Sequence, residues 1–245
     1  MRRFILTIVF LLVPLMARAE VLVFAAASLK EPLDRIAAEF GDVTVSYGGS
    51  GAQARQVLLG APADVVLLAN EAWMTALQDA QAVQPESVAD FASNRLVFVG
   101  PAGSAPLDLT REAIDARRGG GRIATGLTEA VPAGIYAKAA LQSLDLWDAF
   151  APHLAEVDNV RAALALVARG QAPLGIVYRT DVRVTPEVTE VAAFPETAHP
   201  PIRYTAAVTR DAKDAAADFL AYLLGPEGQD ILAEYGFLPP VVAVD

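Results

Sequence analysis

Apolar and polar positions along the chain form two patterns that alternate: short continuous apolar runs, and longer stretches in which apolar residues recur at helical spacing. Residues 21–25 are continuously apolar, and Leu29, Leu33, Ile36 and Phe40 then recur at the spacing of one helix face. Similar pairs, a short apolar run and then an amphipathic stretch, recur through most of the chain. A strand followed by a helix, repeated in this way, predicts an α/β fold.

The periods give approximate bounds for these elements. The run 65–69 is apolar at every position, which is typical of a strand buried on both faces of a parallel sheet. Strands are expected over 21–25, 43–47, 65–69, 95–99, 122–124, 174–178 and 202–208, and helices over 29–40, 52–59, 71–79, 133–144, 160–169, 212–224 and 226–235.

Two loops rich in glycine and proline interrupt this order. Gly100-Pro101 follows one predicted strand, and Pro200-Pro201 precedes another. Two such passages indicate two lobes joined by a hinge. We expect 20–98 and 204–245 to form the first lobe and 99–203 the second. A single wide sheet is the alternative that the length of 245 residues also allows.

The first nineteen residues have the pattern of a secretory signal peptide. Arg2 and Arg3 precede an apolar run over 4–16, and Ala17-Arg18-Ala19 supplies a small-residue cleavage pattern. A membrane anchor is the alternative, but the run is shorter than the roughly 20 residues that span a bilayer. We therefore expect residues 1–19 to be removed after Ala19 and the mature protein to lie in the periplasm, without insertion into the membrane.

The composition limits the classes of molecule and the kinds of site that are expected for this protein. Hydrophobic residues make up 54% and charged residues 20%, which is typical of a globular chain. The net charge of −10 argues against nucleic acid and anionic membrane surfaces as partners. The chain has no cysteine, so disulfides, thiolate metal sites and a lipidated cysteine are excluded.

Four short segments open directly into predicted helices. They are Ala25-Ala26-Ala27-Ser28, Gly48-Gly49-Ser50-Gly51, Val131-Pro132-Ala133-Gly134 and Asp158-Asn159-Val160. The first turn of a helix carries unpaired N–H groups and the positive end of the helix dipole, which favour anions. Because these segments hold no cationic side chain, they predict a buried anion held by neutral donors.

Together with their order and spacing, these segments resemble those of the periplasmic molybdate-binding proteins that serve ABC importers. The resemblance extends from Val21 to Phe237 and includes Gly60-Ala61-Pro62-Ala63-Asp64 and the run 172–178. It implies a type II periplasmic-binding-protein fold: two α/β lobes, a hinge of two crossing segments, and the oxyanion in the cleft between the lobes. It also implies a monomer without a cofactor, which passes molybdate or tungstate to a membrane permease and its ATPase.

The resemblance also implies the ligand residues. Ser28 and Ser50 correspond to serines that give a hydroxyl and a backbone N–H, Ala133 and Val160 to positions that give only a backbone N–H, and Tyr178 to a phenolic donor. Molybdenum would be held only as the oxyanion, through these same residues.

Each of these residues also has a purely structural interpretation. Ser28 fits a helix cap, Ser50 a turn residue and Ala133 a helix start after proline. Val160 fits the core, and Tyr178 a core aromatic at the end of a strand. Of the neighbouring cations, we interpret Arg161 and Lys138 as solvated or lobe-contact charges rather than anion ligands.

Other functions are less consistent with the sequence. A receptor for a different tetrahedral oxyanion, such as sulfate, is the nearest alternative. A serine hydrolase built on Ser28 or Ser50 would need a histidine in reach, but His153 and His199 belong to no motif that places them there. We therefore expect a binding protein and not an enzyme.

Overall fold

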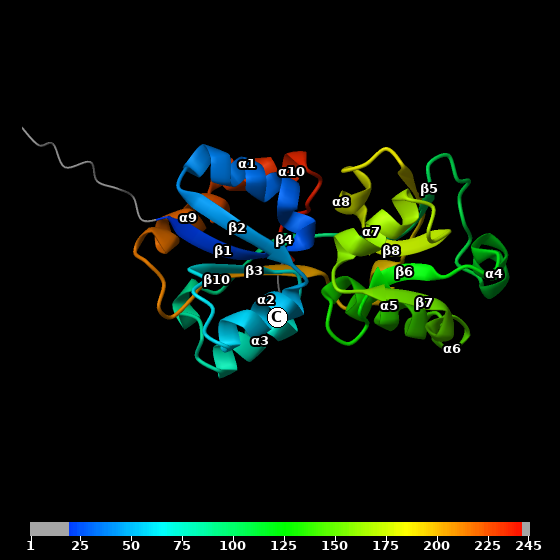
Figure 1. Cartoon of the computed structure of the whole chain (residues 1–245), viewed down its shortest axis with the longest axis horizontal. Coiled ribbons are helices and arrows are strands. Elements are labelled where there is room, and N and C mark those ends of the chain that lie inside the picture. Colours follow the sequence, from blue (N-terminus) through cyan, green and yellow to red (C-terminus); the bar gives the residue numbers. More distant parts are fainter. Residues whose placement is uncertain (1–19, 242–245) are drawn as a thin grey trace, which may run out of the picture.

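The computed structural model describes residues 20–241, and the predicted signal peptide over 1–19 lies outside them. These residues form two lobes, each built on its own five-stranded sheet with helices packed against it (Figure 1). The two-lobed α/β fold is therefore confirmed, and a single wide sheet is excluded. Within the described part of the chain, no helix is long and apolar enough to cross a bilayer.

The first sheet joins strands from both ends of the chain. Its spatial order is β2 (Val43–Gly48), β1 (Val21–Ala26), β3 (Val65–Leu68), β10 (Arg203–Val208) and β4 (Ala89–Ser93). Strand β1 is parallel to β2 and β3, whereas β10 is antiparallel to β3 and β4. In Figure 1, α1 (Lys30–Phe40), α9 (Ala215–Leu224) and α10 (Pro226–Glu234) lie above this sheet, and α2 (Ser50–Leu58) and α3 (Glu71–Asp79) lie below it.

The second sheet repeats this arrangement with the middle of the chain. Its order is β7 (Leu154–Val157), β6 (Ile123–Gly126), β8 (Leu174–Tyr178), β5 (Leu96–Pro101) and β9 (Val188–Ala193). Again the first three strands are parallel, and the fourth is antiparallel to both of its neighbours. The helices of this lobe are α4 (Arg111–Arg118), α5 (Pro132–Ser143), α6 (Trp147–Phe150), α7 (Val160–Ala168) and α8 (Arg179–Val182). Helices α5 and α7 pack against the central strands β6 and β8.

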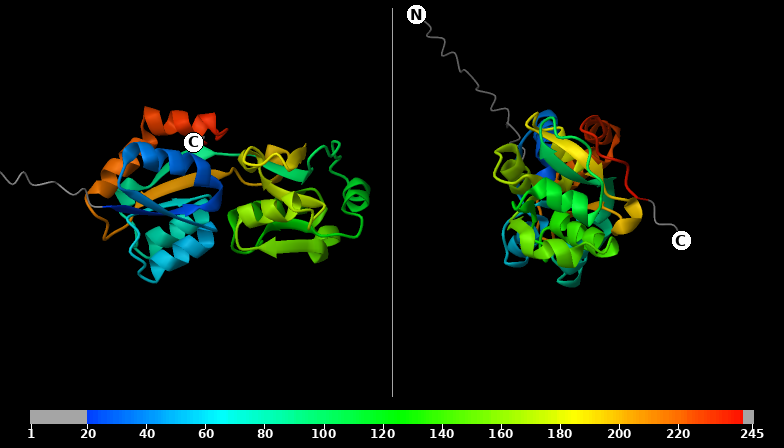
Figure 2. Two further views of the ribbon diagram at one scale, coloured as in Figure 1. Left: turned by 45° about the horizontal axis from the view of Figure 1, so that its top comes forward. Right: turned by 90° about the vertical axis from the view of Figure 1, so that its right-hand side faces the viewer.

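The chain passes between the sheets twice, and Figure 2 shows the two passages side by side. The first is Asn94-Arg95, between β4 and β5, and the second is 194–202, between β9 and β10. Ser93 Oγ donates a hydrogen bond to the carbonyl of Ile202 at 2.7 Å, which ties the passages together.

The first passage lies before the predicted strand rather than after it. Gly100 and Pro101 do not cross between the lobes, because they extend β5 and pair with Thr189 and Val188 of β9. The domain boundaries expected at 98/99 and 203/204 stay a prediction, and the strands place the passages at 94–95 and 194–202.

All the predicted strands and helices are present, with ends within three residues of those expected. The largest difference is at α9, which begins at Ala215 instead of 212. Strands β4, β7 and β9 and helices α4, α6 and α8 were not predicted. All three of these strands lie at the edge of a sheet.

Candidate functional site

A small cavity lies between the two lobes, and all five residues selected from the sequence line it: Ser28, Ser50, Ala133, Val160 and Tyr178. Four of them come after the carboxyl end of a parallel strand, namely β1, β2, β6 and β7 in that order, and Tyr178 is the last residue of β8. The carboxyl ends of strands are where open α/β sheets bind ligands. The two sheets therefore present the carboxyl ends of their parallel strands to the same cavity.

Ser28 comes from the first lobe, on a 3₁₀ turn between β1 and α1. Its hydroxyl is buried and lies 2.9 Å from the Tyr204 hydroxyl of β10. Burial raises the pKa of Tyr204, so that this phenol stays protonated. The amide of Asn94 donates to the same Tyr204 oxygen at 3.4 Å, so Tyr204 can in turn direct its proton to Ser28 or accept one from it.

Ser50 is the first residue of α2 and is also buried. Its Oγ accepts a hydrogen bond from the backbone N–H of Ala69 at 3.0 Å. Because that bond uses a lone pair of the oxygen, the hydroxyl hydrogen stays available to a ligand. Gly49 is needed beside it, since a Cβ there would lie 2.3 Å from the carbonyl oxygen of Asp158 in the other lobe.

The second lobe contributes two backbone N–H groups from helix starts. Ala133 is the second residue of α5, after Pro132, and Val160 is the first residue of α7, after the capping Asn159. First-turn N–H groups have no partner within their helix. Among the hydrogen bonds of residues 20–241, none uses the N–H of Ala133 or Val160 as donor. Both groups are therefore available to an acceptor in the cavity.

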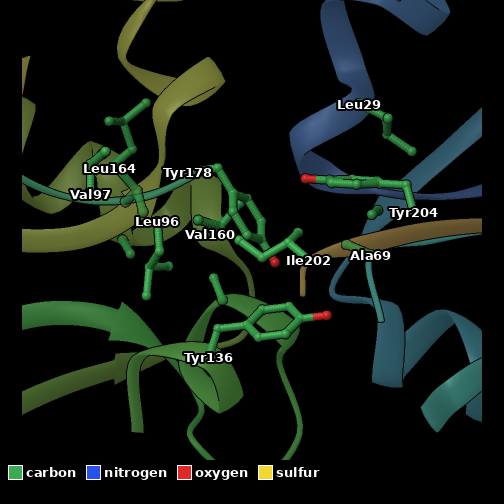
Figure 3. Close-up of a cluster of buried hydrophobic side chains, with 14 of the residues drawn as sticks. Leu29, Ala69, Leu96, Val97, Tyr136, Val160, Leu164, Tyr178, Ile202 and Tyr204 are labelled. Atoms are coloured by element: carbon green, nitrogen blue, oxygen red, sulfur yellow. The ribbon is translucent and has the colours of Figure 1, made fainter. Parts of the chain in front are cut away.

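Tyr178 supplies a hydroxyl without a partner. It ends β8, its side chain is 1% exposed, and its oxygen has no hydrogen-bond partner among the described residues. Burial raises the pKa of Tyr178 well above its usual value, so the group is a neutral donor. Figure 3 shows Tyr178 and Tyr136 reaching from the second lobe, and Tyr204 from the first, into the space between the lobes.

Among residues 20–241, no carboxylate and no cationic side chain lines this cavity. Lys138 instead pairs with Glu129, and its ammonium lies 5.4 Å from the centre of the Trp147 ring. Arg161 pairs with Glu31 of the other lobe and with Asp181. The lobe-contact interpretation is thus correct for Arg161, whereas Lys138 contacts its own lobe.

Two contributors to the site, Tyr204 and Asn94, were not identified from the sequence. Tyr204 orients Ser28, and Asn94 donates both to Tyr204 and, at 2.8 Å, to Thr180 Oγ1. Tyr204 lies within a predicted strand, and Asn94 within a passage that was not recognised. Neither position has a sequence pattern that distinguishes it from an ordinary core or loop residue.

The histidines do not line the cavity. His199 contacts the carbonyl of Pro200 through Nδ1, and its ring lies edge-on to Tyr136. Within residues 20–241, no group of three or more histidine, aspartate or glutamate side chains could hold a metal ion. The chemistry of this cavity therefore suits a small anion, which its hydroxyl and backbone N–H donors could bind.

Comparisons with known proteins agree with this geometry. The family model of bacterial extracellular solute-binding proteins matches residues 21–238. Among curated proteins, the Escherichia coli molybdate-binding protein ModA is 42% identical, with 89% of this chain and 88% of that protein covered. The Haemophilus influenzae ModA is 38% identical, with 90% and 91% covered.

Solved structures show the same fold. A periplasmic molybdate-binding protein of Azotobacter vinelandii superposes with a TM-score of 0.80 at 24% identity, covering 91% of this chain and all of the other. The sulfate-binding protein SubI of Mycobacterium tuberculosis superposes with a TM-score of 0.75 at 19% identity, covering 91% and 87%. The resemblance to molybdate-binding proteins is confirmed, and the chain belongs to the bacterial extracellular solute-binding proteins.

Proposed function

We propose that this chain binds molybdate, and also tungstate, between its lobes and delivers it to an ABC importer. The observation that carries this proposal is the cavity at which Ser28, Ser50, Ala133, Val160 and Tyr178 meet. Relatives with 42% and 38% identity that are named as molybdate-binding proteins support the choice of anion. In this proposal molybdenum is the cargo, as an oxyanion, and the protein needs no cofactor.

The donor set suits a fully deprotonated dianion. Closing the lobes over an anion removes its water, and several convergent donors must compensate for that loss. The hydroxyls of two serines and one tyrosine, with the backbone N–H groups at the helix starts, supply them. Because the chain as a whole is acidic, the attraction has to be local, from dipoles and hydroxyls.

A binding role fits the cavity better than a catalytic one. Nucleophilic attack by Ser28 or Ser50 would need a base, and the neighbours of their hydroxyls are Tyr204 and the N–H of Ala69. Neither His153 nor His199 lines the cavity. We therefore propose that the protein is not an enzyme, and an ester-hydrolysis assay of the mature chain should give no turnover above the buffer rate.

The same proposal implies where the protein acts. Removal of residues 1–19 after Ala19 would release the mature chain into the periplasm as a monomer. There the liganded protein would dock on the permease, whose partner ATPase drives import. The sheet passages at 94–95 and 194–202 would act as the hinge for lobe closure.

We expect selectivity in the order molybdate and tungstate, then sulfate, then phosphate. Hydrogen phosphate carries a proton that needs an acceptor, and leaving it unpaired would cost about 1–3 kcal/mol. Sulfate carries no proton, but a smaller anion would leave some of the five residues' donors too distant. Calorimetric titration of the mature protein with the four anions measures this order, and sulfate or phosphate binding as tightly as molybdate would contradict it.

A further inference from the structure

One arginine joins the two lobes beside the cavity without lining it. Arg161 lies on α7 of the second lobe, next to Val160. Its Nη1 and Nη2 donate to the two carboxylate oxygens of Glu31, on α1 of the first lobe, at 2.9 and 2.6 Å. Nη2 also donates to the backbone carbonyl of Ser28 at 3.1 Å. One side chain thus binds two residues of the opposite lobe.

The other side of the same guanidinium contacts its own lobe. Arg161 Nε lies 2.6 Å from Oδ1 of Asp181, which is fully buried. The second oxygen of that carboxylate accepts the backbone N–H of Tyr178 at 3.0 Å. Arg161 therefore contacts Ser28 directly, is covalently adjacent to Val160, and reaches Tyr178 through Asp181. These are three of the five candidate ligand residues.

The geometry of this contact depends on the shape of arginine. A guanidinium presents several N–H donors in a fixed plane, so Arg161 can donate to the Glu31 carboxylate and the Ser28 carbonyl at once. In the same orientation its charge forms an ion pair with Asp181. A lysine ammonium is a single point charge on a flexible stem. The Arg161 side chain is 17% exposed and Glu31 is 33% exposed, so water screens this pair less than a surface pair.

Other contacts show that the lobes are closed in this structure. Trp73 Nε1 of the first lobe donates to the carbonyl of Ala130 in the second at 3.0 Å. The same carbonyl lies 2.5 Å from where a Cβ on Gly51 would be, which leaves no room for a side chain. The Arg161–Glu31 pair joins elements of different lobes, so it forms only when the lobes come together.

We propose that Arg161 is a positioning residue and, with Glu31, a latch: it holds the lobes closed and sets the donors around the anion without touching the anion itself. This inference rests on the proposed oxyanion function. A latch that forms after the anion has entered slows release and leaves capture unchanged. The dissociation rate constant should therefore respond to its loss, and the association rate constant should not.

The test is stopped-flow kinetics of molybdate binding to the full mature chain, followed by tryptophan fluorescence, because Trp73 lies at the lobe contact. Glu31→Gln removes the charge of the latch at a part-exposed residue. Arg161→Lys keeps the positive charge but loses the planar set of N–H donors. We expect roughly tenfold faster dissociation in both variants, with association within twofold of wild type.

The matched control is Glu190→Gln. It breaks a similar two-bond pair, in which Arg179 donates to Glu190 at 2.7 and 2.8 Å, but both residues belong to the second lobe. This variant should release molybdate at the wild-type rate. The latch would be overturned if Glu31→Gln released molybdate at the wild-type rate, or if Glu190→Gln accelerated release as much as Glu31→Gln does. Either result would leave the proposed function intact. Failure of the wild-type protein to bind any tetrahedral oxyanion would overturn both.

Discussion

Tyr178→Phe should weaken oxyanion binding without lowering the stability of the unliganded protein. The hydroxyl that this change removes is buried and has no hydrogen-bond partner among the described residues. A hydrogen bond to a charged acceptor contributes about 1.5–3 kcal/mol. Since each 1.4 kcal/mol is a factor of ten, its loss should raise the dissociation constant roughly 10- to 150-fold. Without ligand the hydroxyl makes no hydrogen bond within the described residues, so phenylalanine should be neutral or stabilising.

The matched comparison is Tyr204→Phe. Its hydroxyl is bonded to Ser28 and Asn94, so its removal should lower the free energy of unfolding by about 0.5–1.5 kcal/mol. Calorimetric titration with molybdate and denaturant unfolding without ligand measure the two effects for both variants. A Tyr178→Phe protein that unfolds more easily but binds molybdate as wild type does would show that this hydroxyl is structural.

The central strands and the long helices of this fold could be predicted from the sequence because their pattern is local. Strand β3 is buried at every position, and α1 buries Leu33 and Ile36 from one face. Burial on both faces gives a continuous apolar run, and burial on one face gives helical spacing. Both signals depend only on which side of the element faces the core.

The edge strands that were not predicted have no such pattern. Strand β7 is only four residues long and includes an exposed glutamate, and β4 has a single large apolar residue, Phe91. These segments are strands because a neighbouring strand offers a partner, which is a contact distant in sequence. Helix α4 was not predicted for a different reason: it buries only Ile114, so the segment is polar overall and has too few apolar residues to mark a helix face.

The candidate anion site could be predicted from the sequence because helix starts have local signals, whereas the contacts that support the site could not be predicted. Proline before Ala133, asparagine before Val160 and glycine before Ser50 are local signals of a helix beginning. The partner of Ser28 is Tyr204, which lies 176 positions away. Only the strand order, which places β10 beside β3, brings that hydroxyl to the first lobe's binding edge.

Val160→Pro should weaken molybdate binding, whereas Val160→Ala should leave it nearly unchanged. The proposed role of this residue uses only its backbone N–H, which proline lacks and alanine keeps. The backbone tolerates proline here, because Val160 is the first residue of α7, where proline is favoured. Asn159 before it already has the extended conformation, φ −159° and ψ 165°, that a residue preceding proline adopts.

The two variants separate the N–H from the side chain. Both lose the packing of a buried valine, so both should lower the free energy of unfolding to a similar extent. Only proline should raise the dissociation constant, by the roughly 10- to 150-fold that loss of a donor to a charged acceptor implies. Calorimetric titration measures the binding, and circular dichroism establishes that both variants are folded. Equal losses of affinity in two folded variants would mean that the Val160 side chain, and not its N–H, is what the anion site requires.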